Sequence, residues 1–373
     1  MFNKYKEWLL TGLLLLTLTS LMVQAHAESL RYVDARQFRI INRGYLDTMP
    51  ALTRIPDALQ DDTRPEIFEL AQCSAGIGIR FRTNSSTIAA RYQLKNDEIM
   101  NHMPFTGIKG SDLYVLTEKD NTWHYLATIR PQEGKEQQRK YVTRMDGKMH
   151  EYLIYLPLYD GVNRFEIGVD STAELAYPMA ENPRKGGKIV FFGTSIMQGG
   201  CASRTGVTQT NQLQRILNRE CVNMGFSGSA KLYEQNARML LKMDEDIAMY
   251  VIDPLMNNPK DMVDTLSYQF MKILVTNITD KPILMVPAEK QPNQEFDTLL
   301  CKNNPLRNAY WKRTYLQLRK EGHKNLYYMD SCDFAGKDGE GTVDNVHLTD
   351  IGFNNYVQAI LPYLKRLLGR RNK

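Results

Sequence analysis

The 373-residue sequence lacks an excess of charge of one sign, is poor in cysteine and has a single long hydrophobic run. Its 47 Lys and Arg residues are interspersed with 42 Asp and Glu residues, apart from a short basic tail, so there is no basic footprint for nucleic acid. The five cysteines match neither a disulfide framework nor a zinc site. We expect buried free thiols, and only Cys301 with Cys332 would be considered as a pair. The 43% hydrophobic content excludes a disordered or fibrous chain.

The single hydrophobic run covers residues 9–23 and follows two lysines, Lys4 and Lys6. Ala25-His26-Ala27 then supplies small residues for cleavage, so residues 1–27 are predicted to be a secretory signal peptide. A retained membrane anchor is the alternative, but the run is short for a spanning helix and diluted by Thr and Ser. No cysteine precedes Cys73, which excludes a lipid attached after the signal. We expect an exported protein, periplasmic or secreted, without a membrane span after signal removal.

Residues 28–183 have the pattern of a β-sandwich, with a jelly-roll-like arrangement. Short segments alternate in polarity or are rich in β-branched and aromatic residues, turn residues separate them, and no helical pattern interrupts them. Many short strands without crossover helices predict an antiparallel sandwich. The polar segment 180–187 contains Pro183 and a glycine pair, and is the expected domain boundary. The predicted strands cover residues 77–82, 87–92, 113–117, 122–129, 151–156 and 164–169.

Residues 188–373 have a different pattern, in which buried strands alternate with segments of helical length. This alternation predicts a doubly wound parallel sheet of five strands. The predicted strands cover residues 188–193, 221–225, 247–252, 282–286 and 326–329. The predicted helices cover residues 209–219, 233–243, 259–276, 308–320 and 352–368.

Ligands bind beyond the carboxyl ends of the strands in such a sheet, so the residues that follow each strand are the candidate site. Ser195 follows the first strand and Gly228 the second, while Asn257 follows the third. Each has an ordinary explanation as a helix cap or a turn. The Ser195 segment is not a Gly-x-Ser-x-Gly elbow, because Met197 occupies the second glycine position.

An Asp-x-x-His sequence, Asp344 to His347, follows the fifth strand. One short loop at this spacing brings the carboxylate to the far nitrogen of the imidazole, where it fixes the tautomer and stabilises the imidazolium. A surface turn is the alternative for this pair alone. Together, however, the strand ends gather a nucleophile, three oxyanion donors and a base, which independent caps and turns would rarely assemble.

These residues resemble those of the SGNH (GDSL-type) hydrolases, whose four named residues fall on Ser195, Gly228, Asn257 and His347. The segment from Gly193 to Arg204 is similar to that of a branch of exported bacterial esterases. In that branch a β-sandwich carrying a Gly-x-Asp-Leu-Tyr signature comes first, and residues 110–114 match the signature. Met197 and Met256 depart from the branch pattern, and we expect both to change the shape of the pocket floor.

The resemblance implies ester hydrolysis without a metal or organic cofactor. Ser195 is then the nucleophile, His347 the base and Asp344 its partner. The N–H groups of Ser195 and Gly228 and the amide of Asn257 form the oxyanion hole. The branch implies removal of small acyl groups, chiefly acetyl, from carbohydrate.

Three further residues are candidates for binding substrate. His102 and Thr106 lie in a loop, residues 101–107, that we expect to reach the cleft of the hydrolase domain, although a plain connecting loop is the alternative. Arg204 closes the similar segment. A lipase or thioesterase would use the same catalytic set, and a glycan-binding protein with a decayed hydrolase domain is the non-enzyme alternative. The oligomeric state stays open.

Overall fold

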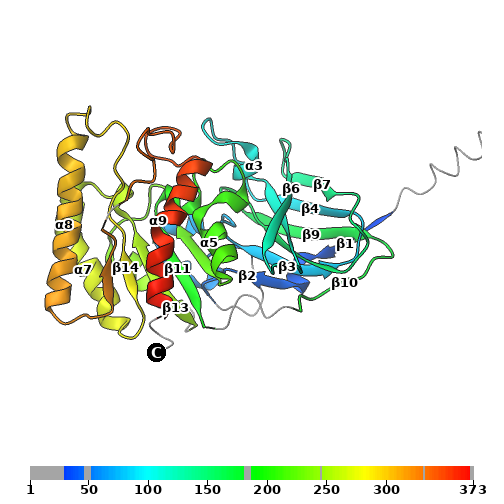
Figure 1. Ribbon diagram of the computed structural model, residues 1–373, viewed down its shortest axis with the longest axis horizontal. Coiled ribbons are helices and arrows are strands. Elements are labelled where there is room, and N and C mark those ends of the chain that lie inside the picture. The colour runs from blue at the N-terminus through cyan, green and yellow to red at the C-terminus, as the bar shows by residue number, and fades with distance from the viewer. Residues whose placement is uncertain (1–28, 46–51, 180–185, 244–245, 331, 370–373) are drawn as a thin grey trace, which may run out of the picture.

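The computed structural model describes residues 29–45, 52–179, 186–243, 246–330 and 332–369. The predicted signal peptide, residues 1–27, lies outside the described residues, and so does most of the predicted boundary segment 180–187. Figure 1 shows an antiparallel β part, coloured blue to green, beside an α/β part, coloured green to red. No helix among the described residues has the length and apolar character needed to cross a membrane.

The N-terminal part is a sandwich of two antiparallel sheets. Alternate side chains of both sheets meet in one apolar core that includes Phe81, Tyr92, Ile154 and Ile167. One sheet has the order β1-β9-β4-β7, with β1 Leu30–Asp34, β9 Val162–Asp170, β4 Ile88–Leu94 and β7 Glu136–Val142. The other has the order β10-β3-β8-β5-β6, with β10 Leu175–Ala176, β3 Gly78–Thr83, β8 His150–Tyr155, β5 Ser111–Leu116 and β6 Trp123–Ile129, and β2 (Arg39–Ile41) pairs with β3.

The C-terminal part is a parallel sheet of order β12-β11-β13-β14-β15, which confirms the predicted doubly wound fold. Val190 and Phe192 of β11 pack toward α6, α7 and α8, whereas Ile189 and Phe191 pack toward α5 and α9. The strands are β11 Lys188–Gly193, β12 Cys221–Gly225, β13 Ile247–Asp253, β14 Ile283–Met285 and β15 Leu326–Tyr328. The helices are α4 Ser195–Gln198, α5 Gln209–Leu217, α6 Glu234–Leu241, α7 Lys260–Asn277, α8 Leu300–Lys320 and α9 Asp350–Gly369.

The N-terminal part also contains helices, so the expectation of an uninterrupted β pattern is wrong. Helix α2 (Pro65–Ala71) buries Ile67 and Ala71 in the core beneath the parallel sheet, and α3 (Phe105–Ile108) buries Ile108 against the other face of that sheet. Both helices are too short for a helical repeat to stand out in the sequence. They are stabilised by apolar contacts with the α/β part, which no local pattern reveals.

Candidate active site

Ser195 is the first residue of α4, which follows β11 at the carboxyl edge of the parallel sheet. The Thr194 hydroxyl caps this helix by accepting a hydrogen bond from the N–H of Ile196 at 3.3 Å. Gly225 at the end of β12 allows α4 to lie directly on the sheet, since an added Cβ would come within 2.0 Å of the Gln198 nitrogen. The serine is therefore held by close backbone packing, and only 6% of it is exposed.

His347 reaches Ser195 from the loop that precedes α9. Its Nε2 lies 2.8 Å from Ser195 Oγ, and its Nδ1 lies 2.7 Å from Asp344 Oδ2. The other carboxylate oxygen accepts the backbone N–H groups of Val346 and His347 at 3.1 and 2.8 Å, which fixes the loop. The structure thus brings together the three residues that the sequence names as nucleophile, base and orienting acid.

The charge on Asp344 is stabilised by the same contacts. Burial raises the pKa of this carboxyl, but the backbone N–H and the imidazole of His347 lower it by more, and the net pKa lies below the ordinary value. An ionised carboxylate at Nδ1 keeps the ring proton on that nitrogen and leaves Nε2 as the acceptor that faces Ser195.

Gly228 and Asn257 lie on adjoining loops after β12 and β13. Gly228 has φ +68 and is exposed, with open space where a side chain would project. The Asn257 side-chain oxygen accepts the N–H of Ala230 at 3.3 Å, so the two loops are joined and the side-chain NH₂ is the donor end of this amide. Neighbouring Asn258 is buried and donates to the carbonyls of Ala230 and Pro254 at 2.9 and 2.7 Å.

Two residues that brace the site come from the N-terminal part, and sequence reasoning missed both. Arg54 is 5% exposed and donates to the carbonyl oxygens of Gly225, Leu70 and Cys73, and burial lowers its pKa to about 10. The Tyr159 hydroxyl donates to the carbonyl of Ser195 at 3.3 Å. Both contacts span long sequence separations, so no local motif signals them.

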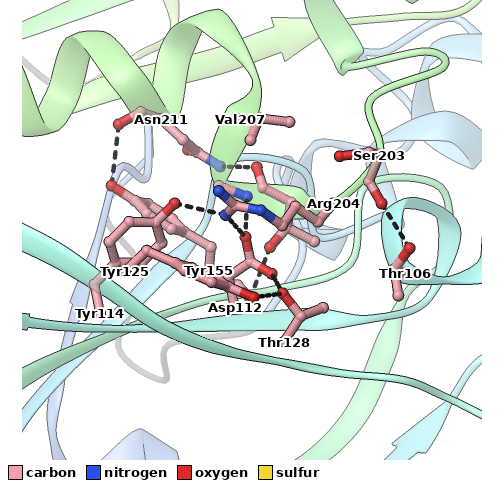
Figure 2. A network of polar contacts seen from close by, with 12 residues as sticks. Thr106, Asp112, Tyr114, Tyr125, Thr128, Tyr155, Ser203, Arg204, Val207 and Asn211 are labelled. Atoms are coloured by element: carbon pink, nitrogen blue, oxygen red, sulfur yellow. Dashed lines mark hydrogen bonds and ion pairs between the residues drawn. The ribbon is translucent and has the colours of Figure 1, made fainter. Parts of the chain in front are cut away.

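The loop of residues 101–107 does reach this region. The ring centroid of exposed His102 lies 5.6 Å from that of His347, with the planes tilted by 47°. Thr106 is placed differently from the expectation, because its hydroxyl donates to the carbonyl of Ser203 at 2.6 Å and joins the two parts of the molecule (Figure 2). Gly107 packs on Ala202 so closely that an added Cβ would lie 2.3 Å from its carbonyl oxygen.

The guanidinium of Arg204 binds residues of the protein itself and is not free to bind substrate. Figure 2 shows its guanidinium between Asp112 and Tyr114, with bonds of 2.6 and 2.9 Å, and it lies 4.0 Å from the ring centre of Tyr125. Asp112 also accepts the N–H of Gly206 at 2.8 Å. The Asp and Tyr of the Gly-x-Asp-Leu-Tyr signature therefore hold the loop that follows the serine.

Met197 and Met256 were expected to shape the pocket floor. Met197 lies in α4, is 1% exposed and packs in the apolar core, where its sulfur accepts a hydrogen bond from the side-chain NH₂ of Gln209 at 3.3 Å. Met256 is half-buried in the turn after β13 and contacts the apolar clusters of both sides of the parallel sheet. All five cysteines are free thiols, with Cys301 exposed and the others buried.

Among the described residues, one group combines metal-ligating side chains at close range. The ring nitrogens of His102 and His347 and the sulfur of Cys201 all lie within 4.8 Å of one another. The rest of the site is built of groups suited to proton transfer and to binding an oxyanion.

Two family models match the sequence and together cover most of the chain. Residues 186–365 match the GDSL-like lipase/acylhydrolase family, and residues 30–175 match the N-terminal domain of SGNH hydrolase-type esterases. No curated protein matches the sequence.

Solved structures share the architecture. A protein described as a GDSL-like lipase from Bacteroides ovatus is 29% identical to this chain, with a TM-score of 0.85. The match covers 91% of this chain and 98% of the Bacteroides ovatus chain. The salicylyl-acyltransferase SsfX3 of a tetracycline biosynthetic pathway is 16% identical with a TM-score of 0.71, covering 92% and 98%. A family two carbohydrate esterase from Clostridium thermocellum, in complex with cellohexaose, is 14% identical with a TM-score of 0.58, covering 79% and 93%. The last two likenesses establish the fold alone.

Proposed function

Because the chain belongs to the SGNH (GDSL-like) hydrolases and carries their N-terminal esterase domain, we propose that it is an exported serine esterase that removes small acyl groups, chiefly acetyl, from carbohydrate. The observation that carries the proposal is the unbroken relay from Ser195 Oγ through the His347 ring to Asp344, with contacts of 2.8 and 2.7 Å. The division into domains at residues 28–183 and 188–373 is part of the same proposal.

The proposed mechanism uses this relay together with the three oxyanion donors that the family resemblance implies. Ser195 Oγ attacks the ester carbonyl and passes its proton to His347 Nε2, while ionised Asp344 stabilises the imidazolium. The backbone N–H groups of Ser195 and Gly228 and the amide of Asn257 stabilise the oxyanion, and one such donor is worth about 10²–10³ in rate. His347 then protonates the leaving alcohol, and water hydrolyses the acyl-enzyme by the reverse sequence.

A carbohydrate substrate is supported by the position of His102 beside the base. Exposed His102 places the N-terminal part at the rim of the site, so a substrate larger than its acyl group meets both parts of the molecule. The neighbour solved with cellohexaose adds support for a glycan. Export, proposed from the run at residues 9–23, agrees with a polysaccharide-derived substrate.

Acetate release from a panel of acetylated oligosaccharides tests the proposal, with Ser195→Ala as the control. We expect release by the wild type and a loss of at least about 10³-fold in the variant, because residual catalysis without the nucleophile is small. A parallel series of esters with increasing acyl length separates the rivals. A preference for long acyl chains or for thioesters would show that the protein is a lipase or a thioesterase instead. Glycan binding without hydrolysis would show that it is a glycan-binding protein.

A further inference from the structure

Two further potential metal ligands, His102 and Cys201, lie close to the imidazole of the base, His347. His102 comes from the loop before α3, Cys201 from the loop after α4, and His347 from the loop before α9. Their ligand atoms lie within 4.8 Å of one another, although the residues are spread over almost 250 positions of the sequence. The esterase mechanism uses only His347 for proton transfer, and it assigns no role to Cys201.

Both imidazoles are oriented as metal-ligating histidines are. Asn101 Oδ1 lies 2.9 Å from Nδ1 of His102, and Asp344 Oδ2 lies 2.7 Å from Nδ1 of His347. Each acceptor calls for a proton on Nδ1 and leaves the lone pair on Nε2, which in His347 lies 2.8 Å from Ser195 Oγ. Second partners of this kind fix the tautomer and orient the ring in metal sites.

Cys201 supplies the third ligand from a rigid position. Its backbone has φ +69, and the N–H of Ala202 closes the turn onto the carbonyl of Gly199 at 3.1 Å. The Cys201 side chain is buried, with 5% of the residue exposed.

Two imidazole nitrogens and one thiolate form a ligand set suited to Zn²⁺. At Zn–N distances of about 2.0–2.1 Å and a Zn–S distance of about 2.3 Å, the ligand atoms of a tetrahedral site are roughly 3.4–3.6 Å apart. The present spacing of at most 4.8 Å therefore has to contract by little more than an ångström. Of the three residues, His102 is the exposed one.

We propose that His102, Cys201 and His347 bind one Zn²⁺ ion, and that the bound ion switches the esterase off. The Cys201 thiol loses its proton to solvent as the S–Zn bond forms, and both Nε2 atoms donate their lone pairs. Three protein ligands leave the fourth position to water. Nε2 of His347 can then no longer accept the proton of Ser195. The inhibition rests on the proposed function, whereas the binding of the ion does not.

Zinc binding is measured directly on the full-length protein by competition with a chromophoric chelator and by metal content after dialysis. Cys201→Ala removes one ligand and His102→Gln another. Cys301→Ala, at the exposed thiol of α8, and His124→Gln, at an exposed histidine of the sandwich, are the matched controls. We expect one Zn²⁺ per wild-type chain, at least a tenfold loss of affinity in the first two variants and none in the controls. Ser195→Ala should still bind the ion.

Inhibition is measured as ester hydrolysis against free Zn²⁺. Cys201→Ala should hydrolyse ester in chelator-treated buffer at the wild-type rate and should need at least tenfold more Zn²⁺ for half-inhibition. Co²⁺ should give the thiolate-to-metal absorption band in the wild type and not in Cys201→Ala. Equal zinc affinity in the wild type and Cys201→Ala, or no stoichiometric binding, would overturn the site while leaving the esterase intact. Stoichiometric binding that depends on Cys201, in a protein without hydrolase activity, would support the site and refute the proposed function.

Discussion

Replacing Arg204 with methionine tests whether the buried ion pair with Asp112 holds the two parts of the molecule together. Asp112 is fully buried and accepts the Arg204 guanidinium at 2.6 Å and the Thr128 hydroxyl at 2.7 Å (Figure 2). Burial raises the pKa of Asp112, and Arg204 is the first influence that opposes the rise. Breaking a buried pair costs about 3–5 kcal/mol. Because the Arg204 side chain is 25% exposed, solvent screening weakens the pair, and we expect a smaller cost of about 2–4 kcal/mol.

The double variant Asp112→Asn/Arg204→Met separates the ion pair from the packing. Asn keeps a side-chain oxygen for the N–H of Gly206 and turns its NH₂ toward Thr128, and no buried charge is left alone. We expect the double variant to recover at least about 1.5 kcal/mol relative to the sum of the single changes, as groups in direct contact do. Arg238→Met, at the exposed pair with Glu234, is the control and should cost less than about 0.5 kcal/mol.

Urea unfolding of the four variants and the wild type gives the free energies of unfolding. The reasoning is refuted if Arg204→Met costs no more than Arg238→Met, or if the effects at positions 112 and 204 add without coupling. The loop held by this pair also carries Ser203, which bonds to Asp350 just after His347. The rate of ester hydrolysis should therefore fall in Arg204→Met and recover in the double variant.

Three further predictions concern the site. Burial raises the pKa of Asp253 to about 8, so the folded protein keeps a proton that the unfolded chain loses above about pH 4. The free energy of unfolding should therefore fall as the pH rises from about 4 to about 8, by up to about 1.4 kcal/mol per pH unit. Urea unfolding measured across that range should show this dependence on pH in the wild type and a flatter one in Asp253→Asn. Asn257→Ala should lower kcat by about 10²–10³ with little change in KM, and an unchanged kcat would remove it from the oxyanion hole. His102→Gln should slow hydrolysis of carbohydrate esters more than that of a small generic ester, whereas equal losses would indicate packing.

The strands of the parallel sheet were predictable because both of their faces are covered. β11 and β12 are short and almost entirely buried, with mostly apolar residues, and their bounds agree with the prediction. β7 was missed because Glu136–Val142 lies at the edge of its sheet and buries only Gln137 and Tyr141. An edge strand with so little apolar content has no pattern that distinguishes it from a loop.

The site was predictable only as far as it follows the strand ends. Ser195 and Asn257 follow closely on β11 and β13, and the Asp344–His347 pair lies in the connection between β15 and α9, so the topology places them at one edge. Arg54 acts on Gly225 across 171 positions, and its role depends on burial that the sequence does not display. Arg204 was assigned to substrate for the same reason, since the buried carboxylate that binds it lies 92 positions away.

Covalent labelling tests the central claim, that Ser195 is a nucleophile activated by His347. The folded protein is treated with an organophosphonate probe for serine hydrolases, and the adduct is located by mass spectrometry of the digested chain. We predict one adduct, on the peptide that contains Ser195, absent in Ser195→Ala and much slower to form in His347→Gln. A wild-type protein that stays unlabelled, or a label on another residue that persists in Ser195→Ala, would contradict the account.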